Sequence, residues 1–130
     1  MIDAQTRQAV RVRAEHRCEY CRLPEWANPI PFHIEHIRAK QHGGDDHIEN
    51  LALACDRCNL HKGPNLTGID PESNAVTALF QPREQAWPDH FTSDGSLIVG
   101  KTAIGRTTLT LLQMNAPRRR QLREAISDLS

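Results

Sequence analysis

The alternation of apolar and polar residues predicts two helices and two strands in the first half of the chain. Residues 3–16 carry apolar side chains at helical spacing, behind a capping aspartate. Residues 32–37 alternate apolar and polar side chains, which is typical of a half-buried strand, and residues 51–54 form an apolar run that can return beside it. A short helix from about residue 56 to Lys62 is then expected to stop at Gly63-Pro64.

The second half has a less regular pattern, which predicts short strands and one final helix. Residues 75–80 and 96–99 are short apolar runs typical of strands. Residues 107–114 fit a strand or a helix equally well. An apolar stripe that ends at Leu129 predicts a helix over residues 117–129.

The composition favours a single small domain. A chain of 130 residues with 38% hydrophobic residues can bury one core but not two. No apolar run approaches the length of a membrane span, and the N-terminus lacks the layout of a secretory signal, so a reducing, cytoplasmic environment is expected. Aromatic residues make up only 5% of the chain, so we expect something besides aromatic packing to hold the fold together.

The net charge of zero is a sum of unlike parts. Residues 1–24 carry a net charge of +2, residues 25–94 carry −6, and residues 95–130 carry +4. The C-terminal excess is concentrated in Arg118, Arg119, Arg120 and Arg123. Taken alone, such a run is more often a solvated helix face than a phosphate-binding edge, although arginine binds phosphate oxygens well.

All four cysteines fall in two C-x-x-C pairs. Cys18 and Cys21 form the first pair, and Cys55 and Cys58 form the second. Two such pairs can complete a tetrahedral zinc site that leaves no position open for catalysis. Disulfides are disfavoured in the expected compartment, and a thioredoxin-like redox motif would leave one pair unexplained. The spacing therefore predicts a structural Zn²⁺ whose binding energy supports the fold.

The segment between and around the cysteine pairs resembles the HNH endonucleases, also called ββα-metal or His-Me finger nucleases. It is most similar to a zinc-clamped bacterial branch in which two C-x-x-C pairs flank the motif, and the resemblance covers about residues 14–64. Four matches occur in the family's order: Phe32-His-Ile-Glu-His-Ile37, Gly43-Gly44, Glu49-Asn50-Leu51 and Cys55-x-x-Cys-Asn59-x-x-Lys62.

The resemblance implies an α+β fold with a small, treble-clef-like ββα-metal core stabilised by zinc. In this layout two antiparallel strands, joined by a long loop, pack against a helix that crosses behind them. An N-terminal helix precedes this nuclease core, and a C-terminal α/β extension follows it over about residues 65–130. The whole chain of residues 1–130 is expected to form one domain.

The resemblance also assigns roles to individual residues. His36 is expected to be the general base, because an imidazole takes up a proton near neutral pH. Glu35 and Asn59 are expected to hold a single Mg²⁺ or Mn²⁺, although aspartate and histidine are the more usual residues at these two positions. Asn50 is expected to orient the loop and the base by hydrogen bonds, and Lys62 is placed to meet a phosphate.

The sequence therefore predicts a metal-dependent HNH endonuclease that cleaves DNA. With a nuclease motif present, the C-terminal arginines become candidate contacts to the nucleic-acid backbone. Two alternatives stay open: a non-catalytic, zinc-finger-like module that binds nucleic acid, and an RNA-directed nuclease of the same fold. Nothing in the sequence determines the cleavage specificity or the oligomeric state.

Overall fold

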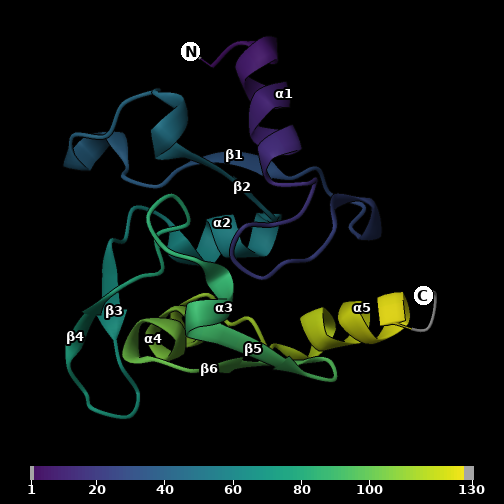
Figure 1. Ribbon diagram of the computed structural model, residues 1–130, viewed down its shortest axis with the longest axis vertical. Coiled ribbons are helices and arrows are strands. Elements are labelled where there is room, and N and C mark those ends of the chain that lie inside the picture. Colours follow the sequence, from purple (N-terminus) through teal and green to yellow (C-terminus); the bar gives the residue numbers. More distant parts are fainter. Residues whose placement is uncertain (1, 128–130) are drawn as a thin grey trace.

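The computed structural model describes residues 2–127 (Figure 1). The predicted end of the last helix, at Leu129, lies outside the described residues. Helix α1 spans Ala4–Arg13, close to the predicted range, and the Asp3 carboxylate caps it by accepting a hydrogen bond from the backbone N–H of Thr6 at 2.7 Å. The chain leaves the helix through Glu15 and His16, which both adopt left-handed backbone angles with φ of 56°.

The nuclease-like core is a two-stranded ribbon with a helix packed against it. Strand β1 spans His33–His36 and pairs antiparallel with β2, Leu51–Ala54, so that His36 lies opposite Leu51. Helix α2, Asp56–Lys62, contacts both strands and ends at Gly63, whose φ of 50° is left-handed. Short 3₁₀ turns at Glu25–Ala27, Lys40–His42 and Ile48–Asn50 shape the connecting loops. The predicted ββα arrangement is confirmed.

One feature of β1 differs from the simple alternating pattern. The polar Glu35 is buried, while the apolar Ile34 is only half-buried. The reason is that Glu35 lies on the face of the ribbon that α2 covers, where Lys62 of that helix meets it.

Up to residue 127, the extension consists of two hairpins and three helices. Strands β3, Thr67–Ile69, and β4, Val76–Ala78, form one hairpin, and β5, Phe91–Asp94, and β6, Leu97–Gly100, form the other. The helices are α3, Trp87–His90, α4, Ala103–Leu111, and α5, Pro117–Ser127. The pattern predicted β4, β6 and α5 but not β3, β5 or α3, and the ambiguous run over 107–114 is helical up to Leu111. Helix α4 packs on β3, β4 and β6.

The extension packs directly on the first half of the chain, and residues of both halves belong to one hydrophobic core. The Trp87 indole stacks on Phe91 with ring centroids 5.0 Å apart, and its N–H donates to the backbone oxygen of Tyr20 at 2.7 Å. Arg83 forms an ion pair with Glu19, next to the first cysteine pair. Phe91 is thus a buried core residue, and the partly buried Trp87 packs against the core. Over residues 2–127, no helix combines the length and the apolar character needed to cross a membrane.

Candidate functional site

The four cysteines converge into one buried cluster. Their sulfur atoms all lie within 4.8 Å of one another, and none forms a disulfide. Each C-x-x-C turn closes on itself: the backbone N–H of Cys21 donates to the Cys18 sulfur at 3.5 Å, and that of Cys58 donates to the Cys55 sulfur at 3.4 Å. Cys55 is at the same time the N-cap of α2, so the second turn also starts the helix that packs on the ribbon.

The cluster has the size and chemistry of a zinc site. The sulfurs of Cys21 and Cys55 lie 3.8 Å apart. A regular tetrahedron with Zn–S bonds of about 2.3 Å has sulfur–sulfur edges of about 3.8 Å. Hydrogen bonds among the four cysteines lower the pKa of Cys21 and Cys55, whereas burial raises the pKa of Cys18 and Cys58. Four cysteines without a disulfide, converging at this spacing, fit the predicted Zn²⁺.

Arg119 completes the surroundings of this cluster. Its guanidinium donates to the sulfur of Cys58 at 2.8 Å and to that of Cys55 at 3.4 Å. The side chain comes from α5, and the residue is only 6% exposed. Its prediction as a contact to the nucleic-acid backbone is therefore wrong for this conformation, because the guanidinium faces the thiolates and has almost no contact with solvent.

The other arginines of the C-terminal run differ among themselves. Arg118 is exposed, as a backbone contact requires. Arg120 is half-buried and donates to the Ser96 hydroxyl at 3.2 Å. Arg123 donates to the Ser96 carbonyl at 2.6 Å and to the Asn115 side chain at 2.9 Å, so it ties α5 to the β5–β6 hairpin. Arg119, Arg120 and Arg123 thus make contacts within the protein.

His36 lies at the end of β1 and is held by the loop that follows it. Its Nε2 is 2.8 Å from Oδ1 of Asp46, and the imidazole is about one-quarter exposed. The Asp46 carboxylate also contacts the Lys40 ammonium at 3.3 Å. The hydrogen bond with His36, followed by that with Lys40, lowers the pKa of Asp46 to about 2. The structure thus places an ionised carboxylate against one nitrogen of the imidazole.

Asn50 fixes the ends of that loop. Its side-chain oxygen accepts from the backbone N–H of Arg38 at 2.9 Å, and its amide donates to the carbonyls of Arg38 at 3.0 Å and Asp45 at 2.9 Å. These bonds hold the residue before Asp46 close to the residues after His36. The geometry is what a loop-orienting asparagine requires.

Glu35 and Lys62 form a buried ion pair between β1 and α2. The Lys62 ammonium lies 2.7 Å from the Glu35 carboxylate and donates to the carbonyl of Ile37 at 2.8 Å. The two residues are 5% and 2% exposed. Burial raises the pKa of Glu35, and the charge of Lys62 opposes that shift. The expectation that Lys62 meets a phosphate is therefore corrected, since its ammonium is enclosed and already paired.

Asn59 lies one helical turn before Lys62, so the two residues share a face of α2. Its side-chain amide is half-buried and makes no hydrogen bond within the described part of the chain. A carboxylate and an amide oxygen are suitable ligands for a hard divalent cation. The donor types of Glu35 and Asn59 thus fit Mg²⁺ or Mn²⁺, but a cation at Glu35 must share that carboxylate with Lys62.

Sequence reasoning missed three participants in these sites. Asp46 belongs to a Gly-Gly-Asp-Asp stretch that indicates a turn, and nothing in the pattern says which aspartate turns toward His36. Arg119 was assigned to the surface because a charge run carries no information on which member is buried. Tyr20 is fully buried inside the first C-x-x-C pair, and burial, followed by the charge of the Glu35 carboxylate, raises the pKa of its phenol well above its ordinary value.

Comparison with known proteins supports the resemblance. Residues 18–65 match the family model described as HNH endonuclease. The match runs from the first cysteine to just beyond Lys62, so it contains the cysteine cluster, the ribbon, the loop and α2. No curated protein and no solved structure matches the chain. The predicted HNH resemblance is confirmed for this segment, which points to a nuclease-type function and to metal binding.

Proposed function

We propose that this protein is a metal-dependent HNH endonuclease that hydrolyses phosphodiester bonds of DNA. The observation that carries the proposal is the position of His36 and its contact with Asp46. His36 ends the first strand of a ββα unit that matches the HNH model, and its Nε2 is hydrogen-bonded to the Asp46 carboxylate. This bond leaves the other ring nitrogen to take a proton from an attacking water.

The chain's own residues divide the work in this proposal. Asn50 keeps the loop closed, Asp46 fixes the orientation and tautomer of His36, and His36 removes the proton from water. Glu35 and Asn59 are the residues that would hold a divalent cation. When bound, such a cation supplies charge stabilisation to the phosphoryl group and the leaving oxygen. The zinc cluster holds the start of α2 and has no catalytic part, because all four of its ligand positions come from cysteine.

Plasmid nicking tests the proposal. We expect the purified protein to convert supercoiled DNA to the open circular form with Mg²⁺ or Mn²⁺, and EDTA to abolish the reaction. A structured RNA assayed under the same conditions separates a DNA nuclease from an RNA-directed one. The absence of cleavage of either substrate with either metal would refute the proposal.

One observation favours a second candidate, a zinc-stabilised module that binds nucleic acid without cleaving it. The carboxylate expected to bind the catalytic cation is already neutralised by a buried lysine. A binding module needs no open metal position, so this ion pair can serve packing alone. Retention of DNA in a gel-shift assay, together with no metal-dependent nicking, would select this candidate.

A further inference from the structure

The C-terminal helix supplies a charged partner to the cysteine cluster from outside the family segment. Arg119 lies 54 residues beyond the end of the family match at residue 65. Its guanidinium nevertheless donates hydrogen bonds to the sulfurs of Cys58 and Cys55, at 2.8 and 3.4 Å. Within the run, Arg118 is exposed, and Arg123 donates hydrogen bonds to Ser96 and Asn115. Among the arginines of the described residues, Arg119 is the one that donates hydrogen bonds to the cysteine sulfurs.

The charge of a zinc–tetrathiolate group explains why a cation belongs there. Four thiolates around one Zn²⁺ leave two net negative charges, and here the thiolates are buried. A buried charge is costly unless it is paired and hydrogen-bonded. Arg119 offsets one of the two charges and donates N–H groups to the sulfurs that carry it.

The guanidinium is held in place by its remaining donors. Its Nη1 donates to the backbone oxygen of Leu112 at 2.7 Å and to that of Gln113 at 3.3 Å, while its Nη2 faces the two sulfurs. One rigid, planar fork thus joins α5, the turn that precedes it and the second cysteine pair. A lysine ammonium cannot reproduce this pattern, because all its donors radiate from a single atom.

We propose that Arg119 is an integral partner of the zinc site: it compensates the charge of the zinc–thiolate group, bonds two of its sulfurs, and thereby slows the loss of the metal. The proposal rests on zinc at the cluster and not on nuclease activity. It also explains why part of a conspicuous arginine run is buried and directed away from solvent.

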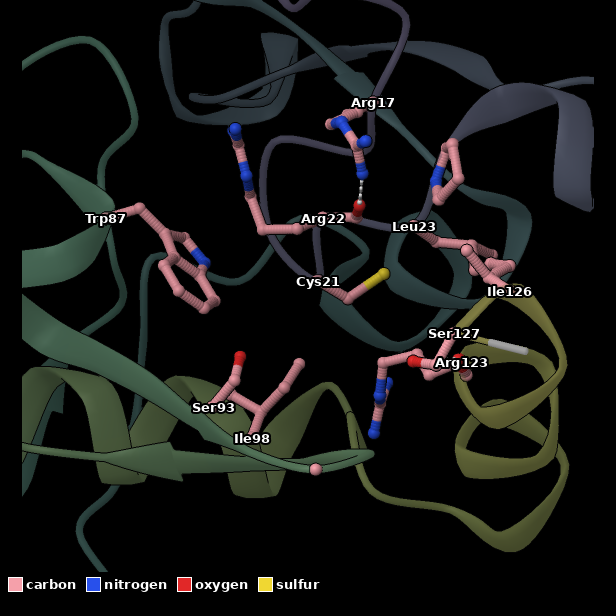
Figure 2. A pocket seen from close by; sticks show the side chains of 12 residues that line it. Arg17, Cys21, Arg22, Leu23, Trp87, Ser93, Ile98, Arg123, Ile126 and Ser127 are labelled. Carbon is pink, nitrogen blue, oxygen red and sulfur yellow. Dashed lines mark hydrogen bonds between the residues drawn. The ribbon is translucent and has the colours of Figure 1, made fainter. Parts of the chain in front are cut away.

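A cavity beside Cys21 offers a competing chelator a path toward the cluster. Cys21 lines a cavity of about 170 Å³ between the first cysteine turn, the β5–β6 hairpin and α5 (Figure 2). Cys21 itself is only 2% exposed, and Arg17, Arg22 and Arg123 also line the cavity. Since α5 forms one wall, weaker attachment of α5 at Arg119 widens this path. Loss of Arg119 is therefore expected to accelerate zinc release.

Zinc transfer to a coloured chelator tests the proposal. Metal analysis first establishes the zinc content of the folded wild type, and a folded, zinc-free protein would overturn the idea. We expect Arg119→Gln to release zinc about 10 to 100 times faster, as is common when a residue bonded to a metal ligand is lost. Arg119→Lys, which keeps the charge but loses the fork, is expected to be intermediate. The matched control Arg118→Gln, at the exposed neighbour, should release zinc like the wild type.

A spectroscopic measurement separates this role from a merely structural one. In the Co²⁺-substituted protein, the sulfur-to-cobalt charge-transfer band reports the electron density on the thiolates. Loss of the N–H···S bonds in Arg119→Lys or Arg119→Gln should move this band to longer wavelength, whereas Arg118→Gln should leave it unchanged. If Arg119→Gln fails to fold, Arg119→Lys carries the same test. The proposal would be overturned if the Arg119 variants released zinc at the wild-type rate and kept the charge-transfer band at its wild-type position.

Discussion

The segment of residues 18–65 and the extension after it are held together by different forces. The first segment contains a cysteine cluster, a buried Glu35–Lys62 ion pair and a loop fixed by asparagine hydrogen bonds. The extension has no such cluster among its described residues and relies on aromatic packing and on the buried carboxylate of Asp70. The first segment thus adds the cysteine cluster and a fixed loop to its apolar core, whereas the extension combines aromatic packing with the ion pair between the buried Asp70 and Arg106.

The candidate catalytic residue, His36, and the residues that hold it lie in the first segment: Asp46 bonds its ring and Asn50 fixes the loop. Buried polar groups such as the Glu35–Lys62 pair of the same segment are costly unless they are paired. The extension covers the core, and α5 adds Arg119 to the cluster.

Removing zinc should have the largest effect. Structural zinc in small domains contributes about 10–16 kcal/mol of apparent binding free energy, which is folding free energy when the site exists only in the folded chain. We expect a strong chelator, or Cys58→Ser, to abolish cooperative thermal unfolding followed by circular dichroism. The control substitution Ser93→Ala, at an exposed polar position, should leave the transition in place. A chelated protein with an unchanged transition would contradict a zinc clamp.

Trp87→Ala should separate the extension from the core. The variant loses the stack on Phe91 and the bond to the Tyr20 carbonyl. The removal of a packed tryptophan is expected to lower the free energy of unfolding by about 3 kcal/mol, as measured by urea denaturation. Trp26, which is 68% exposed, is the matched control, and Trp26→Ala should change the free energy by less than about 0.5 kcal/mol. Equal effects of the two substitutions would mean that the extension does not support the core.

Asp70 makes the extension sensitive to acid. Its carboxylate receives two bonds from Arg106, at 3.1 and 2.9 Å, and this arginine holds the pKa of Asp70 well below its ordinary value. A depressed folded-state pKa gives stability that is complete above the unfolded pKa of about 3.9 and is lost as the pH falls further. Asp70→Asn should therefore flatten the fall in stability below about pH 4, with Glu72→Gln as the exposed control. Parallel acid-denaturation curves for Asp70→Asn and the wild type would rule out this contribution.

Asp46→Ala should affect catalysis more than folding. The variant removes the bond to Nε2 of His36 and leaves the imidazole free to turn. We expect kcat for DNA nicking to fall about tenfold, a modest part of what a general base contributes, with little change in KM. The carboxylate of the neighbouring Asp45 accepts from the backbone N–H of His47 and not from His36, so Asp45→Ala is the matched control. A change confined to KM would point to substrate contact instead of orientation.

Much of the first segment was predictable because its residues carry strong local signals. Two C-x-x-C pairs, an alternating strand and a Gly-Pro stop define the ribbon, α2 and the zinc cluster without tertiary information. Strands β3 and β5 were missed because they contain too few apolar residues to produce a pattern. The burial of Lys62 and Arg119 could not be predicted either, since each is buried by a partner far away in sequence.

The most direct test of the central claim compares wild type with His36→Ala in the plasmid-nicking assay with Mg²⁺ or Mn²⁺. His33→Ala, at an exposed position on the same strand, controls for handling and folding. Loss of the general base should reduce the nicking rate by about 10²- to 10⁴-fold while DNA binding persists. Equal nicking rates for wild type and His36→Ala, prepared side by side, would contradict the assignment of His36 and with it the proposed mechanism.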